Sequence, residues 1–320
     1  MTRVWSIRAL AGLLCAVMAL GQNQDVAELH DSFKGSTKPG LRVDVDLVLL
    51  NASVTDHSNR HISGLQQQQF QVWEDKIEQQ IQYFSTEDVP LSVGIIFDVS
   101  GSMQNKLIPA LTAANTFMRM GDRGDEYFLV LFSDSAHLVQ DFTTDVSRLQ
   151  DRLLFSRAKG STALYDAMYL GLEKVTHGSN SKKALLLITD GEDNHSRYSY
   201  SDVREFAKEH DVLIYAIGIV EPEGSQVSGY GGRALLENLA NLTGGMAFFP
   251  DSVNALESIC AQVGVDLKNQ YVLGYRSTNQ TGDGKWRKVT VKINRPKGMA
   301  RLAVRAKSGY YAPKIARVMN

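Results

Sequence analysis

The sequence predicts an α/β fold in which a doubly wound, mostly parallel sheet is inserted between flanking β-strands that form a β-sandwich. Three observations lead to this prediction. From residue 91 onward, continuous apolar runs alternate with segments of helical periodicity, as in parallel sheets covered on both faces. Residues 41–87 and 270–312 show strand patterns and little helical periodicity. Each flank holds only about three strands, too few for a sandwich of its own, so pairing of the two flanks is the economical arrangement.

The first 21 residues have the form of a secretory signal peptide. Arg3 and Arg8 precede the apolar stretch ALAGLLCAVMAL, and small residues end it at ALG. This stretch is short for a membrane span, and an uncleaved membrane anchor is the alternative. We therefore expect an exported protein in the periplasm, the cell envelope or the extracellular space.

Cleavage of this segment leaves Cys260 as the one cysteine of the mature chain. A single cysteine cannot form an internal disulfide, and its amphipathic surroundings predict a buried, inert thiol. Residues 22–40 are polar, with Gly and Pro at the end, and indicate a flexible lead-in.

Residues 41–87 are expected to form the first part of the sandwich. In LRVDVDLVLLNASVTD, alternation predicts a half-buried strand whose apolar face consists of Val43, Val45, Leu47 and Leu49. FQVWED and QQIQYFS predict two more strands, joined by a turn near Asp75.

Residues 90–268 carry the α/β pattern. The expected core strands are LSVGIIF, EYFLVLFS, KALLLIT and VLIYAIGIV, with AHLVQDF as an antiparallel edge strand and MAFF as a short last strand. Helices are expected up to about Met120, over TALYDAMYLGLEKVT, and around 200–210, 232–243 and 253–268. Pro109 is compatible only with the first turn of the first helix.

Residues 270–312 return to strand patterns, in QYVLGYRST, WRKVTVKIN and ARLAVRAKSGYY, and residues 313–320 are expected to form a tail. NQTGDGK between the first two strands has the composition of a turn. We expect these strands to complete the sandwich begun by residues 41–87; two separate β appendages are the alternative.

The charge balance argues against a nucleic-acid partner. The 34 basic residues nearly cancel the 35 acidic residues, and no dense basic run occurs. Contact with a membrane is expected only through an N-terminal segment that stays uncleaved.

Oxygen-bearing side chains follow the core strands where ligands of open α/β sheets bind. Asp98, Ser100 and Ser102 follow the first core strand, Asp190 follows KALLLIT, and Thr162 lies in a Gly-Ser turn that opens a helix. Two carboxylates and three hydroxyls suit a hard divalent cation, Mg²⁺ first and Mn²⁺ or Ca²⁺ next. With so few direct carboxylates, such a cation would attract the carboxylate of a partner. A hydrogen-bonded turn is the alternative interpretation.

The pattern D-x-S-x-S with a distant Thr and a distant Asp resembles the metal-ion-dependent adhesion site of von Willebrand factor type A (VWA) domains. The α/β pattern over about 90–268 resembles that Rossmann-like domain throughout. The flanks are similar to a bacterial VWFA-related family frequent in acidobacterial genomes, so the resemblance covers nearly the whole mature chain.

This resemblance implies a specific division of roles. Ser100, Ser102 and Thr162 would reach the metal directly, Asp98 and Asp190 would act mainly through bound waters, and the sixth position would be left for a ligand acid. The implied function is that of an exported, non-enzymatic adhesion or scaffold protein that binds an acidic group of a protein partner.

The enzymatic alternative is a phosphatase of the haloacid-dehalogenase type. It would share the strand-end Asp98, a serine after the second strand, Ser133, and a late acidic DG loop. Its chemistry needs a second aspartate two residues after the first as an acid/base, and this chain has Ser100 there. Ser102 as an acyl-transfer nucleophile lacks the G-x-S-x-G elbow.

The non-enzymatic alternative is a structural envelope module whose metal site is occupied but recognises no partner. The loops HSRYSYSD and EPEGSQVSGYGGR should rise on the metal face. Tyr198, Tyr200 and Tyr230 among Ser and Gly are typical of adaptable contact surfaces and are predicted partner-binding residues. Ordinary polar loops with stray tyrosines are the alternative.

Overall fold

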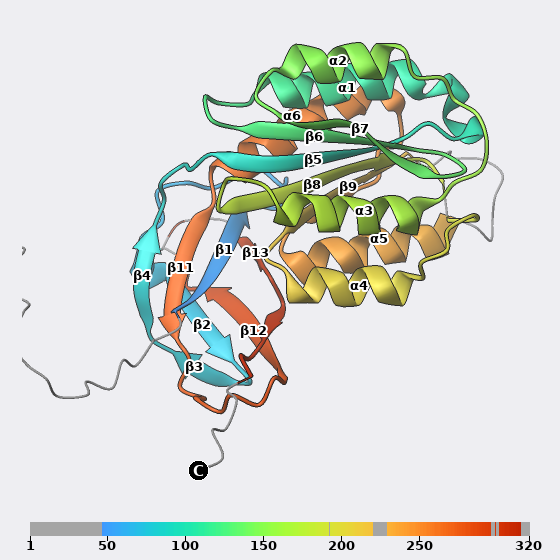
Figure 1. Ribbon diagram of the computed structural model, residues 1–320. Helices are drawn as coiled ribbons and strands as arrows, with labels where there is room; N and C mark the ends of the chain where they lie inside the picture. The colour runs from blue at the N-terminus through green and yellow to red at the C-terminus, as the bar shows by residue number, and fades with distance from the viewer. Residues whose placement is uncertain (1–46, 192, 220–228, 296–297, 299–300, 315–320) are drawn as a thin grey trace, which may run out of the picture. The chain divides into compact units, whose positions relative to one another are not determined.

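The computed structural model describes residues 47–191, 193–219, 229–295, 298 and 301–314 (Figure 1). The predicted signal peptide at 1–21, the lead-in at 22–40 and most of the tail at 313–320 lie outside the described residues. Within the described ranges, no helix has both the length and the apolar character that a bilayer span requires.

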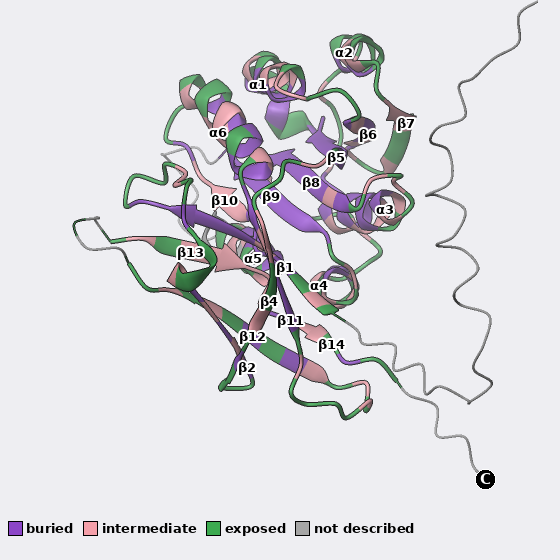
Figure 2. Cartoon of the chain, turned by 90° about the vertical axis from the view of Figure 1, so that its left-hand side faces the viewer, coloured by how far each residue is buried: buried purple, intermediate pink, exposed green. Residues whose placement is uncertain are grey.

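The α/β part is built on a six-stranded sheet with the strand order β10-β9-β8-β5-β6-β7. Its parallel strands are β5 (Leu91–Asp98), β6 (Glu126–Phe132), β8 (Lys182–Thr189), β9 (Leu213–Gly218) and β10 (Met246–Phe248). The edge strand β7 (Ala136–Thr143) runs antiparallel to β6. Figure 2 shows buried residues along β8 and β9, as the continuous apolar runs predict.

Helices cover both faces of this sheet (Figure 1). On one face lie α1 (Leu107–Arg119), α2 (Val146–Leu154) and α6 (Leu256–Lys268), the last preceded by the 3₁₀ turn η3 (Val253–Ala255). On the other lie α3 (Leu164–Thr176), α4 (Tyr200–Glu209) and α5 (Gly229–Thr243). Each face has its own apolar core, which confirms the predicted doubly wound arrangement.

Several details of these helices follow from the sequence. Pro109 lies in the first turn of α1, as predicted. Helix α2 was not predicted, although Asp145 caps it by accepting from the Ser147 N–H, and Leu149 and Leu153 are buried one turn apart. Cys260 in α6 is fully buried, as predicted, and burial raises the pKa of its thiol to about 12.

The flanking strands form two four-stranded antiparallel sheets. The first has the order β13-β1-β11-β4, with β1 (Leu47–Thr55), β4 (Ile81–Ser85), β11 (Tyr271–Arg276) and β13 (Ala303–Ala306). The second has the order β14-β12-β2-β3, with β2 (Phe70–Glu74), β3 (Ile77–Gln79), β12 (Trp286–Ile293) and β14 (Gly309–Tyr311). The 3₁₀ turn η1 (Gln67–Gln69) precedes β2. Each sheet combines strands from both flanks, so the predicted pairing of the flanks is confirmed.

Two strand segments are each divided between the two sheets. QQIQYFS corresponds to β4, which pairs with β11, except that its first residue, Gln79, ends β3. Strand β3 was not predicted, and it pairs with β2 across a turn at Asp75 and Lys76. ARLAVRAKSGYY likewise supplies β13 to the first sheet and β14 to the second. A chain that passes from one sheet to the other must interrupt its ladder, and apolar alternation alone does not report such a break.

The apolar face predicted for β1 is wrong. Leu47 and Leu49 are 40% and 47% exposed, whereas the opposite face, with Leu50, Ala52 and Val54, is fully buried in the sandwich core. The run LVLL carries apolar residues on both faces, so its alternation does not decide which face packs inward. Val43 and Val45 lie outside the described residues.

Candidate metal centre

The loops that carry the five predicted donors meet at the carboxyl edge of the central sheet. Asp98 ends β5, Asp190 directly follows β8, and Thr162 lies two residues before α3. Ser100 precedes the 3₁₀ turn η2 (Gly101–Asn105), which contains Ser102. The Gly101 N–H donates to the Gly160 carbonyl at 3.0 Å and joins this loop to the one with Thr162.

Three of the predicted donors are in direct contact. The Ser100 and Ser102 hydroxyl oxygens lie 3.1 Å apart, and the Ser102 hydroxyl donates to Asp190 Oδ1 at 2.7 Å. An octahedral Mg²⁺ with its usual bond lengths places neighbouring ligand oxygens about 2.9 Å apart. The 3.1 Å separation of the two serine hydroxyl oxygens therefore fits adjacent corners of such an octahedron.

Thr162 lies across Gly191 from Ser102. A Cβ atom at Gly191 would lie 3.2 Å from Thr162 Oγ1 and 3.8 Å from Ser102 Oγ. The absence of a side chain at this position leaves space between the Thr162 and Ser102 hydroxyls.

Asp98 is buried beneath the hydroxyls. Its Oδ1 accepts from the Ser100 N–H at 2.7 Å, and its Oδ2 accepts from the Thr189 hydroxyl at 2.6 Å. Burial raises the pKa of Asp98 above its ordinary value; these hydrogen bonds oppose the rise, and the Asp190 carboxylate adds to it. A nearby cation favours the charged form of such a carboxylate, so the group suits support of a bound metal.

Within the described ranges, no group of three or more His, Cys, Asp or Glu side chains gathers as a metal site. Three of the five predicted donors at this edge are hydroxyls, those of Ser100, Ser102 and Thr162. Serine and threonine hydroxyls are hard, neutral oxygen ligands, which suits Mg²⁺ better than a soft transition metal.

Sequence reasoning missed the residues that hold Thr162 in place. The Thr162 N–H donates to Asn194 Oδ1 at 2.9 Å, and the Asn194 N–H donates back to the Thr162 carbonyl at 3.0 Å. Asp193 in the same loop accepts from the Tyr165 N–H at 3.2 Å. Asp166 in the first turn of α3 accepts from the Tyr198 N–H at 2.9 Å. These contacts fix the loop after β8 against the start of α3.

The predicted partner-binding tyrosines are placed only in part. Tyr198 is exposed and stacks on Tyr169, with ring centroids 3.9 Å apart. Tyr200 is the first residue of α4, and its ring lies 6.4 Å from that of Tyr165. Tyr230 belongs to α5, but its side chain is outside the described residues. Their role in binding stays a prediction.

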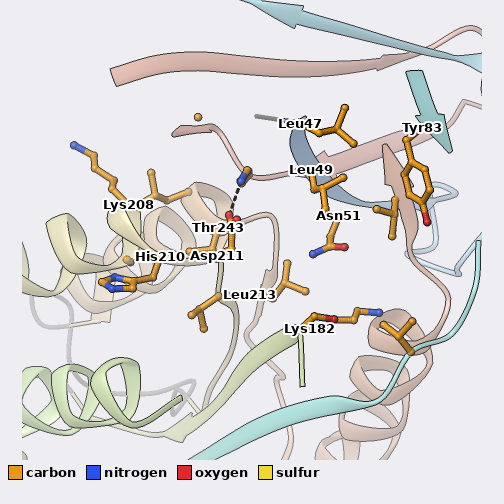
Figure 3. A pocket seen from close by; sticks show the side chains of 18 of the residues that line it. Leu47, Leu49, Asn51, Tyr83, Lys182, Lys208, His210, Asp211, Leu213 and Thr243 are labelled. Atoms are coloured by element: carbon orange, nitrogen blue, oxygen red, sulfur yellow. Dashed lines mark hydrogen bonds and ion pairs between the residues drawn. The ribbon is translucent and has the colours of Figure 1, made fainter. Parts of the chain in front are cut away.

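A cavity of about 450 Å³ lies between the first sandwich sheet and the start of β8 and β9 (Figure 3). The exposed Leu47 and Leu49 of β1 line it, together with Tyr83 and Lys182. None of the five predicted metal donors lines this cavity. Leu47 and Leu49, which point away from the sandwich core, therefore face a cavity next to the α/β part.

Lys182 at this cavity gives a pH-dependent prediction. Its buried ammonium donates to the Leu267 carbonyl. Burial lowers the pKa of Lys182 to about 8, although attraction to the carboxylates of Asp88, Asp266 and Asp125 acts to raise it. The unfolded chain keeps this proton up to about pH 10.4. Between these values the unfolded state binds more protons, so the Lys182 contribution to the free energy of unfolding should rise by up to about 3 kcal/mol.

Urea unfolding of the wild type and of Lys182→Met at pH 7.5, 9 and 10 measures this contribution. The stability of the wild type relative to the variant is expected to increase with pH. A constant difference across this range would show that the ammonium is not disfavoured in the folded protein.

Comparisons with known proteins agree with the architecture. Residues 92–262 match the family model of the von Willebrand factor type A domain. A search of curated proteins gives no match.

Solved structures that match parts of this chain come from several bacteria. The conserved hypothetical protein BatB from Bacteroides thetaiotaomicron is 19% identical, with 56% of this chain and 99% of that chain covered and a TM-score of 0.45. The PilB minor pilin from Streptococcus sanguinis is 14% identical, with 58% and 63% covered and a TM-score of 0.46. A von Willebrand factor type A protein from Catenulispora acidiphila is 12% identical, with 85% and 74% covered and a TM-score of 0.48. Because the family match spans more than half of the sequence and coincides with the α/β part, the chain belongs to the von Willebrand factor type A family.

Proposed function

We propose that this chain is an exported adhesion or scaffold protein that binds a divalent cation and, through the cation, an acidic group of a protein partner. The observation that carries the proposal is the close approach of Ser100, Ser102 and Asp190 at the carboxyl edge of the sheet. The cation is Mg²⁺, with Mn²⁺ or Ca²⁺ as alternatives.

The five donors have two different roles in binding the ion. Ser100, Ser102 and Thr162 supply hydroxyl oxygens, while Asp98 and Asp190 contribute negative charge behind them, mainly through bound waters. When bound, the cation acts as a Lewis acid with a coordination position open to a carboxylate. Neutral hydroxyls leave much of its charge uncompensated, so an anionic partner is attracted.

Exposed apolar side chains in elements close in the chain to the predicted donors support a protein as the partner. Ile108, Leu154 and Phe155 are 75%, 68% and 85% exposed, more than any other large apolar side chain of the described ranges. Ile108 lies in the first turn of α1, just after η2, and the other two lie at the end of α2, from which the chain runs to Thr162. Highly exposed large apolar side chains are typical of protein interfaces.

Export and subfamily are further parts of the proposal. Export is supported by the signal-peptide form of residues 1–21. The similarity of the flanking segments to the VWFA-related family frequent in acidobacterial genomes supports membership of that subgroup.

Removal and addition of metal test the proposal directly. The purified protein is titrated with Mn²⁺ by calorimetry and melted in Mg²⁺ and in EDTA. A ligand at 100 times its Kd stabilises the folded state by about 2.7 kcal/mol, so Mg²⁺ should raise the Tm, and EDTA should reverse the rise. No effect of Mg²⁺, Mn²⁺ or Ca²⁺ would overturn the proposed metal site.

Partner binding and enzymatic activity need separate measurements. Capture of partners from an envelope extract should require Mg²⁺ and fail in EDTA; capture that ignores EDTA would favour a structural module. Turnover of a generic phosphoester with Mg²⁺ would instead favour the phosphatase alternative.

A further inference from the structure

A lysine that the sequence analysis did not single out touches the centre. The Lys106 ammonium donates to Asp190 Oδ2 at 2.7 Å, while Asp190 Oδ1 accepts from Ser102. Lys106 is only 8% exposed, and the Asp190 side chain has no exposed surface. One oxygen of Asp190, a carboxylate predicted to support the metal, therefore accepts a hydrogen bond from the buried Lys106 ammonium.

The position of Lys106 in the fold does not by itself require an ammonium. Lys106 precedes α1, and its backbone N–H donates to Met103 and its carbonyl accepts from Ala110, contacts that any residue could make. A buried ion pair is in general no more stable than a well-packed apolar pair, because both charges lose their hydration. A role in the metal centre would account for a charged side chain at the buried position of Lys106.

The charge of the Lys106 side chain indicates what that role is. Lys106 places a positive charge directly against Asp190, which in turn lies close enough to Asp98 to influence it. A positive charge at this place repels a bound divalent cation and attracts an incoming carboxylate. Without Lys106, both effects would be lost.

We propose that Lys106 sets the charge of the metal centre, so that it weakens cation binding but strengthens binding of an acidic group to the loaded cation. This inference rests on the proposed function of the centre. Lys106 is a positioning and specificity-determining residue that acts through Asp190, not a metal ligand. Its removal should therefore change the two affinities in opposite directions.

The first measurement is the Mn²⁺ affinity of the wild type, Lys106→Met and Lys106→Arg by calorimetry. Lys106→Met should bind Mn²⁺ about tenfold more tightly, because a unit charge this close to a divalent cation is felt even under strong screening. Lys106→Arg, which keeps the charge, should resemble the wild type. Lys159→Met is the matched control: it removes an exposed lysine from the neighbouring loop and should change the affinity less than about twofold.

The second measurement follows the binding of N-acetylaspartate amide to the Mn²⁺-loaded proteins through the relaxation of the probe's protons. Lys106→Met should bind this carboxylate about tenfold more weakly than the wild type, whereas Lys106→Arg and Lys159→Met should not. If Lys106→Met does not fold, Lys106→Gln, which keeps a donor toward Asp190, serves in both measurements.

The outcomes separate the inference from the proposed function. A wild type that binds no Mn²⁺ overturns the proposed function itself. A wild type that binds Mn²⁺ together with a neutral Lys106 variant of equal or lower Mn²⁺ affinity, or of undiminished carboxylate affinity, overturns only the role assigned to Lys106.

Discussion

Replacing Asp266 with alanine is expected to lower the free energy of unfolding by about 3–5 kcal/mol, the usual effect of removing one partner from a buried ion pair. Asp266 lies in α6, is buried, and pairs with the Arg305 guanidinium of β13 at 2.7 Å. It also accepts from the Tyr215 hydroxyl of β9 at 2.6 Å. Alanine would leave the largely buried Arg305 charge without its counter-charge.

The surroundings of Asp266 favour its charged form. Burial acts to raise the pKa of Asp266, but neighbouring His61, Arg305 and Tyr215 outweigh it and hold the pKa below its ordinary value. Asp266 joins the last helix of the α/β part to a sandwich strand, and Arg305 also donates to Thr55 of β1 at 3.3 Å. Loss of this pair should therefore loosen the junction of α6 with the sandwich.

Two variants make the measurement specific, with urea unfolding as the assay. Asp122→Ala removes a largely exposed carboxylate that pairs with Lys268, which lies in the same helix as Asp266, and should cost less than about 1 kcal/mol. Asp266→Leu combined with Arg305→Met removes both charges and should recover most of the lost stability. An Asp266→Ala variant within about 1 kcal/mol of the wild type would show that the pair is not effectively buried.

The α/β part could be predicted well because its physical signal is strong. The run at Leu91–Asp98 is buried along its whole length, and only a central parallel strand with helices on both faces needs such a sequence. The predicted donors followed from the same pattern, because parallel strands end at one edge and polar residues after them meet there.

The sandwich was harder to predict because its strands have short, ambiguous patterns. The face of β1 was misread since LVLL is apolar on both sides, and the break at Gln80 depends on which sheet accepts each half of the segment. These outcomes are decided by tertiary pairing, not by local alternation.

Contacts between distant residues were out of reach for a similar reason. Lys106 and Asp190 are 84 positions apart, and Asp266 and Arg305 are 39 positions apart. No motif links these residues, and each pair exists only because of the relative placement of a helix and a loop or strand. In the sequence, these charged residues cannot be told apart from solvated surface residues. Only the structure shows that they are buried and which residues they pair with.

Replacing Asp98 with asparagine is expected to abolish the stabilisation by Mg²⁺ while leaving the protein at least as stable as the wild type in EDTA. The amide oxygen can still accept from the Ser100 N–H, and the Thr189 hydroxyl can accept from the amide nitrogen. Burial raises the pKa of Asp98, which means that the site without a cation disfavours the charge. A neutral side chain of the same shape removes this cost, but it also removes the charge that supports the cation.

Melting in Mg²⁺ and in EDTA, with Asp145→Asn as the control, measures both effects. Asp145→Asn also removes one carboxylate, but at the start of α2, where asparagine is an equally good cap. The control should keep the full increase in Tm with Mg²⁺, and Asp98→Asn should show none. If Asp98→Asn kept the increase, the cation would bind elsewhere, and the contacts of Asp98 with Ser100 and Thr189 would be those of a hydrogen-bonded turn alone. Because the substitution preserves those contacts, loss of the metal effect in a variant of undiminished stability in EDTA would isolate the carboxylate charge as the cause.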